Sequence, residues 1–91
     1  MNEITLSQYY IIIGRKFDET YYLVPKYVDR GSNGIEIVFK WNRNEKRAYK
    51  FLDEQEAYNA VMTAEKGYSP EVFFIDEDEW VYRSIDNLAE I

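Results

Sequence analysis

The chain has 91 residues and contains neither Cys nor His, which excludes disulfides, thiolate metal sites and histidine-based catalysis. Hydrophobic residues make up 46% and aromatic residues 18% of the sequence, a composition that predicts one folded domain over residues 1–91 and argues against a disordered chain. The formal net charge of −6 is uneven, because residues 70–91 hold seven of the 17 acidic residues and one of the 11 basic residues.

The first two predicted elements are strands rich in aromatic and β-branched residues. Residues 8–17 predict a first strand, in which Gly14 suggests a bulge. Residues 21–30 predict a second strand after a short polar turn. Because Pro25 cannot donate a hydrogen bond to a neighbouring strand, we expect this second strand at an edge of the sheet.

The middle of the chain predicts a hairpin and a fourth strand. The sequence GSNG at residues 31–34 tolerates positive φ angles and predicts a turn. The strand that follows, residues 35–41, places four large side chains on one face: Ile35, Ile37, Phe39 and Trp41. A second turn then leads into residues 46–52, whose alternation predicts a fourth antiparallel strand.

A helix is predicted over residues 53–66. Asp53 is the expected N-cap, Glu56 stands three residues later as its capping-box partner, and Gly67 follows the expected end. At about 100° per residue, one broad face of this helix is apolar and carries Ala57, Tyr58, Ala60, Val61, Met62 and Ala64. The helix should therefore lie across the sheet, which its alanines allow it to approach closely.

Two further strands are predicted at residues 71–75 and 80–85, joined by a turn of four consecutive acids at residues 76–79. Taken together, the pattern predicts an α+β fold. We expect an antiparallel sheet of about four to six strands with the one helix, residues 53–66, packed on one face.

No recognisable catalytic motif is present. There is no glycine-rich phosphate loop, and the serines lack the sequence context of a nucleophile. Carboxylates are abundant, but hydrolysis by paired carboxylates needs two of them held across a cleft, which a domain of this size has little room to enclose. We therefore expect a protein that is not an enzyme and that needs no cofactor.

The acidic turn also invites comparison with calcium loops. Asp76 and Asp78 have the spacing that begins many of them, but the rest of the loop does not follow. Its sixth and twelfth positions, which require Gly and Glu, are Val81 and Asn87. We therefore expect no specific metal site.

A basic stretch at residues 41–50 mixes aromatic and cationic side chains, a composition typical of surfaces that bind single-stranded nucleic acid. The structural alternative is that Trp41 and Tyr49 are core or cross-strand residues, while the cations near the turn keep the protein soluble and protect a sheet edge. Direct binding of nucleic acid is disfavoured by the overall negative charge, since sequence-independent affinity comes from cations that neutralise phosphates.

The acidic end of the chain has two interpretations. One is a solvated turn that keeps the protein soluble and its edge strands apart. The other is a surface that steers association with a basic partner, with aromatic residues as contacts. The candidate partner-binding residues are Glu71, Asp76, Glu77, Asp78, Glu79, Trp80 and Asp86.

A small, acidic, Cys-free, tyrosine-rich chain with strands, one short helix and an acidic end resembles the accessory proteins of bacterial phages and prophages, including anti-CRISPR proteins. This resemblance concerns general style and assigns no residue a role. It implies a protein that inhibits a host machine by binding it, often by occupying a positively charged nucleic-acid channel.

The preferred hypothesis is a non-enzymatic inhibitor whose acidic surface, partly a mimic of nucleic acid, docks onto a basic host protein such as a nucleic-acid-processing or CRISPR effector. One alternative is a structural or assembly protein that forms homo- or hetero-oligomers, including a homodimer, through an exposed strand. Another is a small nucleic-acid-binding module that uses residues 41–50. No stretch approaches the ~20 apolar residues needed to cross a membrane, so a cytoplasmic location is the expectation.

Overall fold

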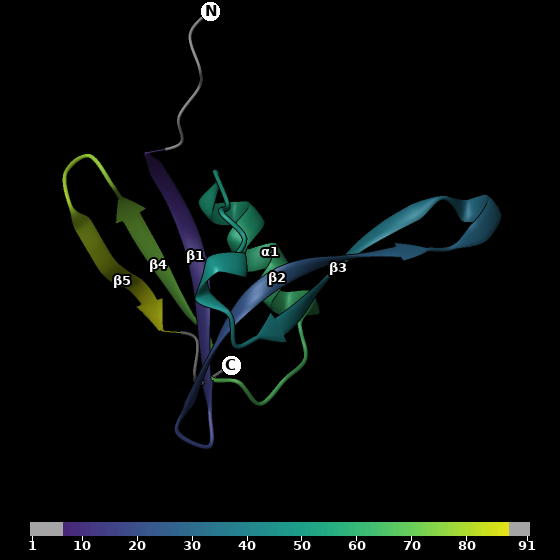
Figure 1. Cartoon of the computed structure of the whole chain (residues 1–91), viewed down its shortest axis with the longest axis horizontal. Coiled ribbons are helices and arrows are strands. Elements are labelled where there is room, and N and C mark those ends of the chain that lie inside the picture. Colours follow the sequence, from purple (N-terminus) through teal and green to yellow (C-terminus); the bar gives the residue numbers. More distant parts are fainter. Residues whose placement is uncertain (1–6, 88–91) are drawn as a thin grey trace, which may run out of the picture.

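The computed structural model describes residues 7–87 and consists of one five-stranded antiparallel sheet with one α-helix (Figure 1). Its strands are β1 (Gln8–Lys16), β2 (Glu19–Asp29), β3 (Ile35–Asn42), β4 (Glu71–Asp76) and β5 (Val81–Asn87), and their order in the sheet is β3-β2-β1-β4-β5. The helix is α1 (Glu54–Thr63), and short 3₁₀ turns span Gly31–Asn33 and Glu45–Arg47. The predicted α+β class, with one helix and an antiparallel sheet, is confirmed.

β1 is the central strand, and its alternating side chains supply apolar residues to both faces of the sheet. On one face Ile12 packs with Leu23 of β2 and Val72 of β4 beneath the small, buried residues of α1 and its C-terminus, which are Ala57, Ala60, Val61 and Ala64. On the opposite face a second cluster consists of Tyr9, Ile11, Ile13 and Phe73. Because one strand serves both clusters, the sheet is apolar on both sides at its centre.

The helix begins where the sequence predicts and ends earlier. The Asp53 carboxylate accepts a hydrogen bond from the backbone amide of Gln55 at 2.7 Å, which confirms the N-cap. The helix ends at Thr63, because Ala64 has an extended backbone conformation, so the predicted end at residue 66 is wrong. Met62, which we expected on the buried face, is 61% exposed.

β1 and β2 pair over a short stretch and then separate. Their register covers the four pairs from Ile13 opposite Tyr22 to Lys16 opposite Glu19. Beyond it, Phe51 occupies the gap and exchanges two backbone hydrogen bonds with Tyr10, with N···O distances of 2.7 and 2.8 Å. The amide of Tyr49 donates to the carbonyl of Leu23, on the other side of the gap, at 3.0 Å. This segment is therefore a wedge between two strands.

The wedge overturns the expected fourth strand at residues 46–52. A 3₁₀ turn occupies Glu45–Arg47, and the residues after it bond alternately to β2 and β1, so they form one isolated bridge instead of a ladder. Alternation of side chains predicted the extended backbone of this segment correctly, but it could not show that two different strands share its hydrogen bonds.

The β2–β3 hairpin continues past the wedge as an arm, which we define as residues 25–39. Over the whole hairpin, β2 and β3 keep an unbroken register of eight pairs, from Tyr22 opposite Asn42 to Asp29 opposite Ile35. Figure 1 shows the arm projecting away from the rest of the sheet and closing through the Gly31–Asn33 turn. The expected edge position of β2 is wrong, because this strand lies between β3 and β1. Pro25 is tolerated there because it lies beyond the part of β2 that pairs with β1.

Among residues 7–87, no helix has the length and apolarity that crossing a membrane requires.

Gly14 marks a close contact and not the bulge that we expected. The β1–β2 register passes through Gly14 without a shift. A Cβ atom at this position would lie 2.7 Å from Cζ3 of Trp41 and 2.8 Å from the carbonyl oxygen of Tyr68. The indole of Trp41 in turn stacks on the Tyr68 ring, with centroids 5.0 Å apart. Glycine at position 14 therefore lets β3 and the segment before β4 meet over β1.

We expect Gly14→Ala to lower the free energy of unfolding by about 1–3 kcal/mol, since both neighbouring groups must shift. Urea denaturation of the two proteins measures this difference. Ser84→Thr, which also adds a methyl group but on an exposed part of β5, is the control and should change stability by no more than about 0.5 kcal/mol. An equal, negligible effect of both substitutions would contradict the close contact.

Candidate protein-binding surface

The seven residues predicted to bind a partner do not lie together. Residues 76–80 form the turn between β4 and β5, whereas Glu71 and Asp86 lie at the other end of this hairpin, where Glu71 is opposite Asn87 and Val72 is opposite Asp86. The sequence predicts that all seven belong to one hairpin, but it does not show that they lie at opposite ends of that hairpin. The turn and the far end therefore have to be considered separately.

At the far end, both carboxylates are occupied by other residues of the chain. Glu71 forms an ion pair with Arg15 of β1, with an N···O distance of 2.7 Å, and its side chain is largely covered. Asp86 accepts a hydrogen bond from the hydroxyl of Tyr58 on α1 at 2.7 Å. This bond, together with burial, raises the pKa of Tyr58 and ties the helix to the edge strand β5.

Asp76 forms the turn instead of presenting charge from it. Its side chain is 6% exposed and accepts hydrogen bonds from the backbone amides of Asp78 and Glu79 at 3.0 and 3.1 Å. Gln8 of β1 donates a further bond to the same carboxylate at 2.9 Å. The bond from Gln8 is the main cause that lowers the pKa of Asp76, opposed by burial and reinforced by the two amides.

Glu77 is held from both its backbone and its side chain. Its amide donates to the carbonyl of Ser7 at 2.7 Å, and its carboxylate accepts a hydrogen bond from the Tyr9 hydroxyl at 2.7 Å. Burial and then this hydrogen bond raise the pKa of Tyr9 to about 12. Glu77 is exposed and contributes negative potential at the surface, but its carboxylate already has a hydrogen-bond partner within the chain.

Three of the seven predicted residues remain accessible to a partner: Asp78, Glu79 and Trp80. All three are exposed, and within residues 7–87 no hydrogen bond or ion pair engages the two carboxylates. Trp80 is 92% exposed, the largest exposure among the described large hydrophobic residues. We call these three residues the turn tip.

The backbone of Trp80 has a positive φ of 56°, in the left-handed region. A residue in this conformation closes the four-residue loop between Asp76 and Val81, the first pair of the hairpin. Glycine is favoured at such positions, because a Cβ atom there costs about 1–2 kcal/mol. Trp80 is thus a bulky residue at a position where its own conformation is strained.

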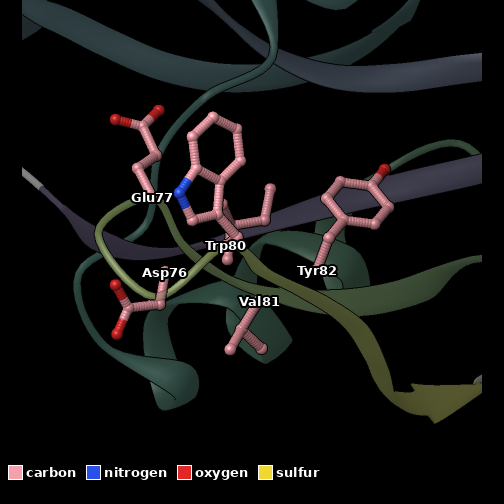
Figure 2. A pocket seen from close by; sticks show the side chains of 6 residues that line it. Asp76, Glu77, Trp80, Val81 and Tyr82 are labelled. Carbon is pink, nitrogen blue, oxygen red and sulfur yellow. The ribbon is translucent and has the colours of Figure 1, made fainter.

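Beside Trp80 the hairpin has a shallow apolar hollow of about 400 Å³, lined by Ile75, Asp76, Glu77, Trp80, Val81 and Tyr82. Figure 2 shows Trp80, Tyr82 and Glu77 on one side of the hairpin, with Asp76 and Val81 directed to the other side. Alternation along the predicted last strand grouped Trp80 with Tyr82 in the same way. The turn tip therefore combines an exposed indole with two exposed carboxylates, and it lies beside an apolar hollow.

The basic stretch at residues 41–50 uses its aromatic residues inside the fold. Trp41 stacks on Tyr68 and donates its indole N–H to the carbonyl of Glu65 at 2.9 Å. Tyr49 contacts the rings of Phe39 and Phe51, with centroids 5.7 and 4.8 Å away. Trp41 therefore packs in the fold as the structural alternative expects, whereas Tyr49 contacts two rings but remains 39% exposed.

Sequence reasoning missed a second exposed aromatic residue. Phe17 is 87% exposed and has a φ of 53°, in the two-residue turn between β1 and β2. It looked like the end of the first strand, but its neighbour Asp18 was the available signal, since Asp favours tight turns. For metals, residues 7–87 contain no group of three or more acidic side chains placed to hold an ion.

The Tyr9–Glu77 contact predicts an alkaline dependence of stability. Because the pKa of Tyr9 is raised to about 12 in the folded protein, its stabilising effect is complete below the ordinary pKa near 10 and is lost as pH rises through 12. Urea unfolding at several pH values between about 8 and 12 should therefore show wild type losing about 1–2 kcal/mol relative to Tyr9→Phe. A difference that stays constant over this range would contradict the raised pKa of Tyr9, which burial and the hydrogen bond to Glu77 produce together.

No protein-family model, curated protein or solved structure matches this chain.

Proposed function

We propose that this chain is a non-enzymatic binding protein that docks the turn tip, Asp78, Glu79 and Trp80, onto a basic surface of another protein. The observation that carries this proposal is the almost complete exposure of Trp80 at a strained, left-handed backbone position. A glycine would form the same loop without the strain. The indole at this position is therefore explained better by a contact outside the chain than by the fold.

The chemistry around Trp80 fits a cationic partner. An exposed indole is the best aromatic acceptor for a Lys or Arg side chain over its face, and it is also among the residues enriched at binding hot spots. Asp78 and Glu79 are its sequence neighbours and have exposed carboxylates. They provide ion pairs at the rim of such a contact, while the apolar hollow beside Tyr82 offers area that a partner can desolvate.

Side-chain hydrogen bonds organise the loop in the free chain. Asp76 fixes the amides of Asp78 and Glu79, and Gln8 fixes Asp76, so the backbone that carries the turn tip is held by side-chain hydrogen bonds. A preformed loop loses less conformational entropy on association than a flexible one. The buried Asp76 thus positions the turn tip for binding, although Asp76 itself does not contact the partner.

The partner we propose is a basic host protein, such as a nucleic-acid-binding or defence protein, in the cytoplasm. The turn tip would occupy Lys or Arg side chains that otherwise contact phosphates, which amounts to inhibition by blockade. A Cys-free composition fits this compartment, since small secreted domains commonly rely on disulfides.

Trp80→Gly separates binding from folding. We expect this variant to unfold with a free energy equal to that of wild type or higher by up to about 1 kcal/mol, because the left-handed strain is relieved. Its ability to retain a basic protein from bacterial lysate on an affinity resin should nevertheless be lost. Phe17→Gly is the matched control, since it relieves the same strain at another exposed aromatic residue and should leave retention intact.

The charge component has its own test. Asp78→Asn combined with Glu79→Gln should weaken retention of the same protein and reduce its dependence on salt between about 0.1 and 1 M, over which the Debye length falls from about 10 to 3 Å. Retention that survives Trp80→Gly, or that is lost equally with Phe17→Gly, would overturn the proposed site.

A further inference from the structure

The two edges of the sheet differ in how they are protected. At one edge, β5 is interrupted by a register shift against β4 between Val72 and Phe73, which disturbs the regular pattern that another strand would need. At the other edge, β3 keeps eight consecutive pairs with β2 and contains no proline. Within residues 7–87 no strand pairs with the outer side of β3. Such a long, regular edge is an open template for a further strand.

One face of this edge is apolar and exposed. Tyr27 of β2 is opposite Ile37 of β3, and Ile35 follows toward the tip of the arm. These three side chains are 67, 53 and 73% exposed. The strip borders a hollow of about 390 Å³ between the arm and α1, lined by Ile37, Phe39, Tyr49, Phe51, Glu56, Asn59, Ala60 and Thr63. Exposed apolar area of this kind marks an interaction surface.

The other face of β3 carries a charge pattern that is complementary to itself. Glu36 and Lys40 lie two residues before and two residues after Val38, and all three side chains share one face of the strand. When a strand pairs antiparallel with its own copy around Val38, each Glu36 is opposite Lys40 of the second copy. Val38 then meets Val38, and on the apolar face Ile37 meets Phe39 and Ile35 meets Trp41.

We propose that two copies of this chain associate through β3 in this register, with a two-fold axis at Val38 and a continuous ten-stranded sheet. A two-fold interface requires one surface to complement itself, and the pattern from Ile35 to Trp41 satisfies this on both faces. This interface lies on β3 and does not involve the turn tip.

Neighbouring registers are less favourable. A shift of two residues places one of the two charges opposite Val38, and a shift of four places Glu36 opposite Glu36 or Lys40 opposite Lys40. Glu36 already pairs with Arg30 of its own chain at 2.7 Å, but its side chain is 54% exposed. A carboxylate has two oxygens and can accept from Arg30 and Lys40 of the second copy together.

Charge variants test the register directly. Wild type should show a monomer–dimer equilibrium in sedimentation velocity as the concentration is raised. Lys40→Glu converts two opposite-charge pairs per dimer into two like-charge pairs, and we expect the dimer dissociation constant to rise at least about tenfold. Glu36→Lys should do the same, and the double variant with both changes should restore the wild-type dissociation constant.

Mixing the two single variants provides the sharper result, because it does not depend on how either one folds relative to wild type. Lys40→Glu presents two acids and Glu36→Lys presents two bases, so an equimolar mixture should form a heterodimer at concentrations where each variant alone is mostly monomeric. Lys66→Glu, which makes the same charge change on an exposed residue after α1, is the control and should dimerise as wild type does.

Three results would overturn the inference. The first is a wild-type protein that remains monomeric up to about millimolar concentration, where even weak interfaces are populated. The second is a dimer that Lys40→Glu does not weaken, and the third is a mixture of the single variants that stays monomeric. Capture of a different protein by the arm, with no self-association, would likewise count against a second copy as the occupant.

Discussion

The insertion of Phe51 between β1 and β2 is the constraint on which the arrangement of this molecule depends. Its two backbone bonds to Tyr10 end the pairing of the two strands, and from that point β2 and β3 leave the plane of the central sheet. The same insertion places the start of α1 directly over the core, because Asp53 follows two residues later and caps the helix. One wedge thus sets the direction of the arm and the position of the helix.

The sequence predicted an element correctly where the backbone chemistry of a few neighbouring residues is enough to specify it. The turn at GSNG, the N-cap at Asp53 and the restart of the chain near Pro70 depend on backbone chemistry within a few residues, and all three occur where expected. Tertiary partners decided the rest. Gly14 is explained by an indole from β3, which no pattern of hydrophobic residues contains. Met62 is exposed because it lies about 140° around α1 from the buried Ala57, so the apolar face is narrower than we expected.

In the candidate site, the number of acidic residues does not tell which of them are free to contact a partner. The sequence shows seven acids near its end but not which of them are already paired. In the structure tyrosine hydroxyls take up three carboxylates, in the contacts Tyr9–Glu77, Tyr21–Glu19 and Tyr58–Asp86. A neutral hydroxyl donor satisfies a carboxylate without cancelling its charge, so a chain rich in both residue types can fix its acids and remain strongly negative. The abundance of tyrosine is explained in part by this pairing.

The order of the strands places β3 and β5 at opposite edges of the sheet, which separates two kinds of contact in space. Association through one edge leaves the other free, so the two surfaces do not compete. In a two-fold assembly centred on β3, the β4–β5 hairpins of the two copies would lie on opposite sides of the axis, and their turn tips would be held apart at a fixed separation. Two identical tips at that separation form a bivalent ligand, whose second contact occurs at an effective concentration set by the rigid sheet. A target that presents repeated basic patches at this spacing would then be held far more strongly than a single contact allows.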